Sequence, residues 1–209
     1  MFSVTTPATS YALLTAAELR TAAGVTGTSY DADLETIGLG VAADIANACD
    51  VTDDGVNPPT LRRESVTQTF RHGCDFRTYK ALILARRFVS SVVVVENDIT
   101  LVLTTDYLVE AAAGLLTRVT QDAIDVWPAG TIVVTYDAGF ATVSADLRGA
   151  AMELVRLRWS QRPGARDPSI RQEVVEGVGS TTYWINPVSD PLFPQSVRDR
   201  LIRYRTYNV

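Results

Sequence analysis

The sequence predicts an α+β protein: a small helical bundle with an inserted β-rich subdomain, barrel- or sandwich-like, and an extended C-terminal arm that ends in a short helix. Apolar residues recur at helical spacing near the N-terminus and again after Gly139, whereas the stretch between consists of short β-branched runs separated by turn residues. We therefore expect four parts: an N-terminal helical part (1–60), a β-rich insertion (61–140), a core helix packing on the N-terminal helices (141–165), and an extended hairpin or arm with a C-terminal helix (166–209).

Two helices are expected in the first part. Thr15-Ala-Ala-Glu18 has the spacing of a capping box, in which the Thr hydroxyl accepts the N3 amide and the Glu reaches back. This short helix should end near Gly24. A second helix should begin around Ser29–Asp31, where acidic residues favour the positive end of the helix dipole. Its apolar positions at helical spacing are Leu34, Ile37, Val41, Ile45 and Cys49.

The second part reads as short strands. Asn97-Asp98 and Ala113-Gly114 lie between apolar runs as turn signals. Strands this short and this closely spaced are typical of a small barrel or sandwich. The candidate strands are 64–71, 88–96, 99–103, 106–110, 115–120 and 131–137.

The helix after Gly139 should begin at Ser144, a plausible N-cap. One apolar stripe consists of Leu147, Ala150, Ala151, Leu154 and Leu157. A different face carries Arg148, Met152, Arg156 and Trp159. Aromatic and Arg side chains together are common where a helix meets a second body, so this face is predicted to contact another subunit. The alternative is that Trp159 packs under a loop of its own chain.

The C-terminal part contains a hairpin or extended arm over 172–186, then a stiff spacer with three prolines, then a helix over 196–207. Val197, Leu201 and Tyr204 share one face of that helix. An isolated helix of this length is marginal in water, so it should be ordered only when docked. The docking surface could belong to its own domain or to a neighbouring molecule.

Composition limits the function classes. The formal net charge is −5 and the sequence pI is about 4.9, which argues against a dedicated duplex-DNA binder. Residues 1–60 hold eight acids and one Arg, whereas 61–90 hold seven bases and two acids. This uneven charge distribution suits head-to-tail contact between copies, with the acidic face of one against the basic face of the next. Two solvated faces without any partner would show the same charge distribution. No apolar run is long enough to span a bilayer, and no signal peptide is expected.

No convincing catalytic or metal site is evident. Cys49 and Cys74 form no CxxC, so neither zinc nor another cofactor is predicted. Two thiols in a chain of 209 residues fit a reducing compartment, and a bridge between them stays open. His72 stands next but one to Cys74, and Asp137 follows a predicted strand, yet each is more simply explained as part of a surface loop or turn.

Several segments together resemble a known family. They are TIVVTYDAGF at 131–140, VSADLRGA at 143–150, the N-terminal LLTAAELRTAAGV and the later QEVVEGVGSTTYW. In this order they resemble the head–tail connector (adaptor) proteins of tailed bacteriophages and related gene-transfer particles. Ser144 stands where the family often has proline, although Ser also starts a helix as an N-cap.

The resemblance implies a structural virion protein and not an enzyme. Many copies, about twelve, would form a ring beneath the portal protein at the virion neck, after assembly in the host cytoplasm. The ring would extend the DNA channel, with no sequence-specific binding and no membrane, and would offer a docking surface to a stopper, head-completion or tail-terminator protein. The C-terminal arm would reach the portal, with these anchors: Leu192, Phe193, Val197, Leu201 and Tyr204.

Two other function classes remain open. One is a monomeric ligand- or carbohydrate-binding β module, supported by Trp127, Tyr136 and Tyr107 in the β region. It would need an exposed aromatic platform. The other is a hydrolase that uses His72, Cys74 or Asp137.

Overall fold

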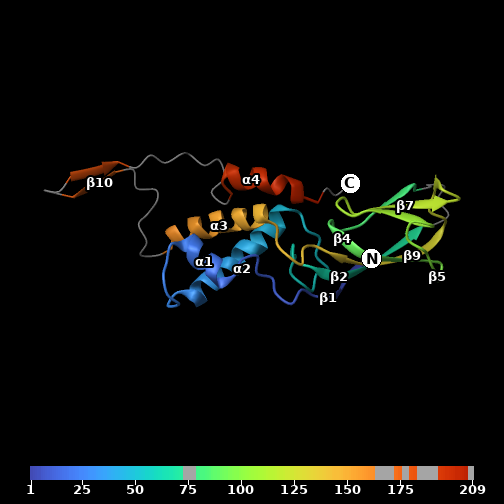
Figure 1. Ribbon diagram of the computed structural model, residues 1–209, viewed down its shortest axis with the longest axis horizontal. Helices are drawn as coiled ribbons and strands as arrows, with labels where there is room; N and C mark the ends of the chain where they lie inside the picture. Colours follow the sequence, from blue (N-terminus) through green and yellow to red (C-terminus); the bar gives the residue numbers. More distant parts are fainter. Residues whose placement is uncertain (73–78, 163–171, 176–178, 183–192, 207–209) are drawn as a thin grey trace. The chain divides into compact units, whose positions relative to one another are not determined.

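The computed structural model describes residues 1–72, 79–162, 172–175, 179–182 and 193–206 (Figure 1). Helices and antiparallel sheets occur together, and a short helix lies near the C-terminus, which confirms the predicted α+β class. The chain divides into two compact units. The first contains residues 1–11, 46–143 and the segment from Tyr204 onwards; the second contains 12–45 and 144–203.

The first unit is built from two antiparallel sheets. One is five-stranded, in the order β1 (Phe2–Thr6), β2 (Glu64–His72), β9 (Gly130–Ala138), β4 (Val89–Glu96) and β5 (Ile99–Thr100). The other has the order β3 (Ala81–Ile83), β7 (Leu115–Thr120) and β6 (Tyr107–Glu110), with β8 (Ala123–Asp125) paired to β7.

Both sheets contribute to a single hydrophobic core. β9 places every second side chain in it, from Ile132 through Val134 and Tyr136 to Ala138, as the period of two in a strand requires. Leu116 of β7 and Tyr107 of β6 enter the same core from the other sheet. Two sheets over one core form a sandwich, the second of the two β architectures that the sequence allowed.

The N-terminal segment differs from the expectation. Phe2–Thr6 forms an edge strand that pairs with β2, so that Phe2 lies opposite Gln68. Its partner lies about sixty residues further along the chain, and a pairing over that separation leaves no local signal in the sequence. The short strands β3 and β8 were not predicted either.

The second unit contains α1 (Ala16–Ala23), most of α2 (Asp31–Ala48), α3 (Ala145–Ser160), α4 (Gln195–Leu201) and the antiparallel pair β10 (Gln172–Val175) and β11 (Gly179–Thr182). The capping box is confirmed: the Thr15 hydroxyl accepts from the Glu18 amide at 3.3 Å, and the Glu18 carboxylate accepts from the Thr15 amide at 2.8 Å. Ser144 caps α3 by accepting from the Leu147 amide at 3.3 Å.

α3 is the centre of this unit. In the predicted stripe, Leu147, Ala150, Ala151 and Leu154 are buried, whereas Leu157 is half-buried. Both α1 and α4 pack on this helix. On α2, Gly38 leaves room for the Leu19 side chain of α1: a Cβ at this position would lie 2.8 Å from a Leu19 methyl carbon. The glycine therefore allows α1 and α2 to approach closely.

Candidate assembly surfaces

Trp159 of α3, predicted to face another subunit, is packed by its own unit. Only 6% of it is exposed. Its ring meets that of Tyr30 edge to face, with centroids 5.4 Å apart, and the Arg162 guanidinium lies 3.6 Å from the ring centroid. The structure therefore shows the arrangement that the sequence left as the alternative.

The other three residues of that predicted face remain accessible to different degrees. Arg148 forms an ion pair with Glu18 at 3.1 Å while 45% of its side chain stays exposed. Met152 is half-buried and Arg156 is exposed. An accessible surface on α3 thus consists of Arg148, Met152 and Arg156, without the aromatic residue.

The short C-terminal helix α4 is docked within its own unit. It packs on α3, and Val197 and Leu201 are buried. Polar contacts flank this packing: Ser196 donates to the Glu153 carboxylate, and Arg203 pairs with Asp146 at 3.0 Å. The own-domain docking that the sequence left open is what the structure shows.

The chain beyond α4 is held by the first unit. Tyr204 is buried there, and its ring lies 5.7 Å from that of Phe88 and 5.8 Å from that of Phe140. The Thr206 amide donates to the Cys49 carbonyl at 2.8 Å. Of the two remaining predicted anchors, Phe193 is half-buried and Leu192 lies outside the described residues. Three of the five predicted portal anchors are thus covered by their own chain.

The residues considered for catalysis do not converge. Asp137 lies opposite Ser65 on the β2–β9 ladder and accepts a hydrogen bond from its hydroxyl, whereas His72 lies at the other end of the ladder, opposite Gly130. Ser65 and His72 are seven positions apart along β2, a distance of about 23 Å in an extended strand. Cys74 lies outside the described residues. This arrangement cannot form a triad from His72 and Asp137.

The aromatic residues that supported a ligand-binding module are core residues. Trp127, Tyr136 and Tyr107 are each at most 3% exposed. The Tyr107 hydroxyl donates to the Val92 carbonyl at 2.8 Å, and burial raises the pKa of Tyr136. These side chains cannot provide the exposed platform that a carbohydrate-binding surface needs.

Cys49 is a free, fully buried thiol among the described residues. Burial raises its pKa to about 12, so it is protonated at neutral pH. No three His, Cys, Asp or Glu side chains lie close enough to hold a metal ion within the described part of the chain. Within that same part, no helix is both long and apolar enough to cross a membrane.

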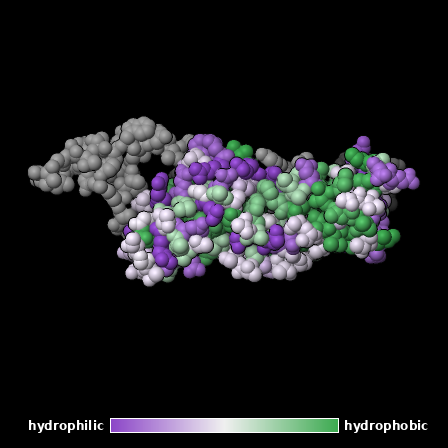
Figure 2. Space-filling view, viewed as in Figure 1, coloured by the Kyte–Doolittle hydropathy of each residue, from purple (hydrophilic) through white to green (hydrophobic). Residues whose placement is uncertain are grey.

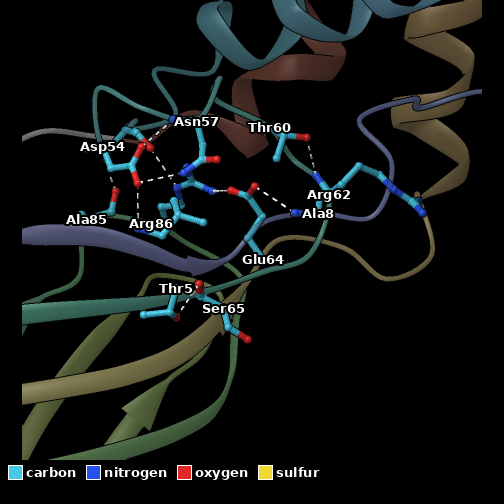
Figure 3. Close-up of polar contacts among 12 residues, drawn as sticks. Thr5, Ala8, Asp54, Asn57, Thr60, Arg62, Glu64, Ser65, Ala85 and Arg86 are labelled. Carbon is cyan, nitrogen blue, oxygen red and sulfur yellow. Dashed lines mark hydrogen bonds and ion pairs between the residues drawn. The ribbon is translucent and has the colours of Figure 1, made fainter.

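The sandwich carries a polar cluster that the sequence did not reveal (Figure 3). Glu64 and Arg86 form an ion pair with 0% and 3% of their side chains exposed. Glu64 also accepts from the Ala8 amide at 3.1 Å, and Arg86 donates to the Thr52 carbonyl at 2.8 Å. Beside it, Asp54 accepts from the amides of Asn57 at 2.8 Å and Val4 at 2.9 Å. The cluster ties the N-terminal segment to the sandwich.

The sandwich also exposes apolar side chains, and Figure 2 shows hydrophobic residues gathered over this unit. The exposed ones on or near β4, β5, β6 and β8 are Val93, Ile99, Val102, Leu103, Leu108 and Ile124. Groups of exposed apolar residues are common where a protein meets a partner.

Comparison with known proteins yields matches only at the level of structure. No protein-family model matches the sequence, and no curated protein matches it. Its fold is similar to that of a chain in the neck of an empty gene transfer agent (GTA) particle, computed with C6 symmetry. The TM-score is 0.57 and the identity 15%, over 100% of this chain and 97% of that one.

A chain from the virion of a native GTA particle is similar to the same degree. The TM-score is 0.56 and the identity 16%, and the match again covers 100% of this chain and 97% of the other. The likeness to these GTA chains therefore extends over both units and includes the sandwich.

Proposed function

We propose that this chain is a structural subunit of the neck of a GTA-like or phage-like particle, acting as a head–tail connector. The observation that carries the proposal is the shared fold along the whole length of a chain from a GTA particle neck. The sequence motifs that resemble connector proteins, TIVVTYDAGF at 131–140 followed by VSADLRGA at 143–150, also support it.

In the proposed assembly, about twelve copies form a ring beneath the portal and extend the DNA channel. Sixfold symmetry, in which the similar neck structure was computed, is compatible with twelve copies. An acidic chain suits a channel wall, since negative potential repels the phosphate backbone and keeps DNA from adhering. The exposed apolar side chains of the sandwich would offer a docking surface to the stopper, head-completion or tail-terminator protein.

The portal contact is assigned to the arm just before α4, with Leu192 and Phe193 as its anchors. Val197, Leu201 and Tyr204 have another task in this structure, because they hold α4 and the following residues on the chain's own units. Arg148, Met152 and Arg156 remain the candidate inter-subunit face on α3.

The test is the mass and shape of the purified protein, alone and mixed with the portal protein of its particle. Rings in electron micrographs, or a monomer that becomes a ring on the portal, would support the proposal. A protein that stays monomeric and does not bind the portal protein would refute it. Phe193→Ala should weaken portal binding without changing the melting temperature by more than a few degrees. Val56→Ala, at a position that is 85% exposed and outside every assigned contact surface, is the control.

A further inference from the structure

A pocket of about 260 Å³ opens in the second unit between α1 and α2. Leu14, Leu19 and Leu34 form its buried floor, and Leu39, 42% exposed, lies at its mouth. This volume falls just below the range of about 300–1,000 Å³ typical of small-molecule sites. It is suited to an aliphatic side chain presented by another protein.

The rim of the pocket is acidic. Asp31 and Glu35 line it, and Glu35 is exposed to solvent. Asp31 pairs with Arg20 at 3.2 Å, with a third of each side chain still exposed. An apolar side chain flanked by positive charge would therefore match both the floor and the rim.

The same unit presents such a side chain elsewhere. Ile202, just after α4, is 53% exposed although it is large and apolar. Arg200 precedes it by two residues and Arg203 follows it directly. Arg203 pairs with Asp146 but keeps 64% of its side chain exposed. Arg200 is exposed as well and supplies positive charge next to Ile202.

The helix arrangement prevents a copy from filling its own pocket. α1 and α4 both pack on α3, and α4 lies on the other side of α3 from α1 and α2 (Figure 1). The pocket and Ile202 are thus on different faces of one unit. Contacts between unlike faces of identical subunits are heterologous, and they form a closed ring when the rotation between neighbours closes.

We propose that Ile202 of one copy inserts into the α1–α2 pocket of the next copy, with Arg200 and Arg203 facing the acidic rim. This inference rests on the proposed ring, and it names the residues that join neighbouring subunits. It is independent of the face formed by Arg148, Met152 and Arg156.

The test is a cross-link between two full-length variants, both carrying Cys74→Ser so that Cys49, which is buried, is the only other thiol. One carries Leu39→Cys and the other Ile202→Cys. Rings assembled from the mixture and oxidised should give a disulfide-linked dimer, whereas rings from either variant alone should not. A mixture of Leu39→Cys with Ile99→Cys, on the sandwich, is the matched control and should stay uncross-linked.

A charge exchange gives a second measurement. Ile202→Asp should weaken ring formation at least tenfold, and Glu35→Lys in the same chain should restore much of it, because the new pair is again complementary. Normal rings with no cross-link and no effect of Ile202→Asp would overturn this pairing and leave the neck function standing. Failure of the wild-type chain to form rings even with the portal would overturn both.

Discussion

Glu64 of β2 and Arg86, which precedes β4, form an ion pair that is almost wholly excluded from solvent. The pair also satisfies two backbone groups, since Ala8 donates to Glu64 and Arg86 donates to the Thr52 carbonyl. The Arg86 guanidinium further lies 5.5 Å from the centroid of the Phe2 ring. Two charges thus connect β2, the N-terminal segment and the loop before β2 inside one unit.

Removing one member of this pair should be costly. Glu64→Ala leaves the Arg86 charge buried without its partner, for which the expected loss is about 3–5 kcal/mol of unfolding free energy. Urea unfolding followed by circular dichroism measures it. The double variant Glu64→Leu/Arg86→Met should recover much of this loss, because no buried charge then remains unpaired. A Glu64→Ala variant within 1 kcal/mol of wild type would contradict the burial of the pair.

The hydrogen bonds to the Asp54 carboxylate predict that the first unit loses stability at low pH. This carboxylate accepts from the amides of Asn57, Val4 and Val56, and these bonds hold its pKa well below the ordinary 3.8. A carboxyl with a lowered folded-state pKa contributes stability that is fully present above the unfolded-state value and is lost as the pH falls below it. The urea midpoint should therefore drop as the pH falls from 5 towards 2.5.

Asp54→Asn is the matched variant for this effect. Its amide oxygen can still accept from a backbone amide, but it does not titrate, so the midpoint should depend less on pH than in wild type. Glu18 also has a lowered pKa, mainly because of its hydrogen bond from the Thr15 amide. The urea midpoint of Asp54→Asn should therefore still fall somewhat with decreasing pH. Identical slopes for wild type and Asp54→Asn would exclude Asp54 as a source of acid sensitivity.

The docking of α4 on α3 predicts that its apolar face stabilises the second unit. Leu201 is 3% exposed, and its replacement by Ala should cost about 2–5 kcal/mol, as for other buried leucines. Ile202→Ala removes a side chain of similar size that is half-exposed, so it should cost far less. Thermal unfolding of the two variants gives the comparison. Equal melting temperatures would mean that α4 does not stay docked in solution.

The sequence predicted those elements whose signals are local. The capping box at Thr15, the N-cap at Ser144 and the strand that became β9 follow from residues within one or two turns or one strand. The strand over Phe2–Thr6 depends on β2, far along the chain. Contacts of that separation are fixed by packing, which a single sequence does not display.

The assembly surfaces show the same limit. Helical spacing correctly placed Leu147 and Leu154 on a buried stripe, but it could not show that Tyr30 and Arg162 cover Trp159. Likewise, helical spacing placed Val197 and Leu201 on one apolar face of α4. Only the packing of α4 on α3 shows that this face is buried within the same chain. The assignment of Leu192 and Phe193 to a portal contact stays a prediction.

Trp159 offers the sharpest comparison between packing and assembly. Because it is 6% exposed and contacts both Tyr30 and Arg162, its replacement by Ala should leave a cavity and cost about 3–5 kcal/mol. Arg156, three residues earlier on α3, is exposed, and Arg156→Ala should change the unfolding free energy by no more than about 0.5 kcal/mol.

In ring assembly we expect the opposite ranking: at a temperature where both variants are folded, Arg156→Ala should have the larger effect. Arg156→Ala should weaken assembly if the accessible face of α3 joins subunits, while Trp159→Ala should assemble in proportion to its folded fraction. Urea unfolding and sedimentation of the same two samples measure both quantities. Should Trp159→Ala keep wild-type stability and lose assembly, the indole would have to contact a neighbouring subunit, and its packing against Tyr30 would not persist in solution.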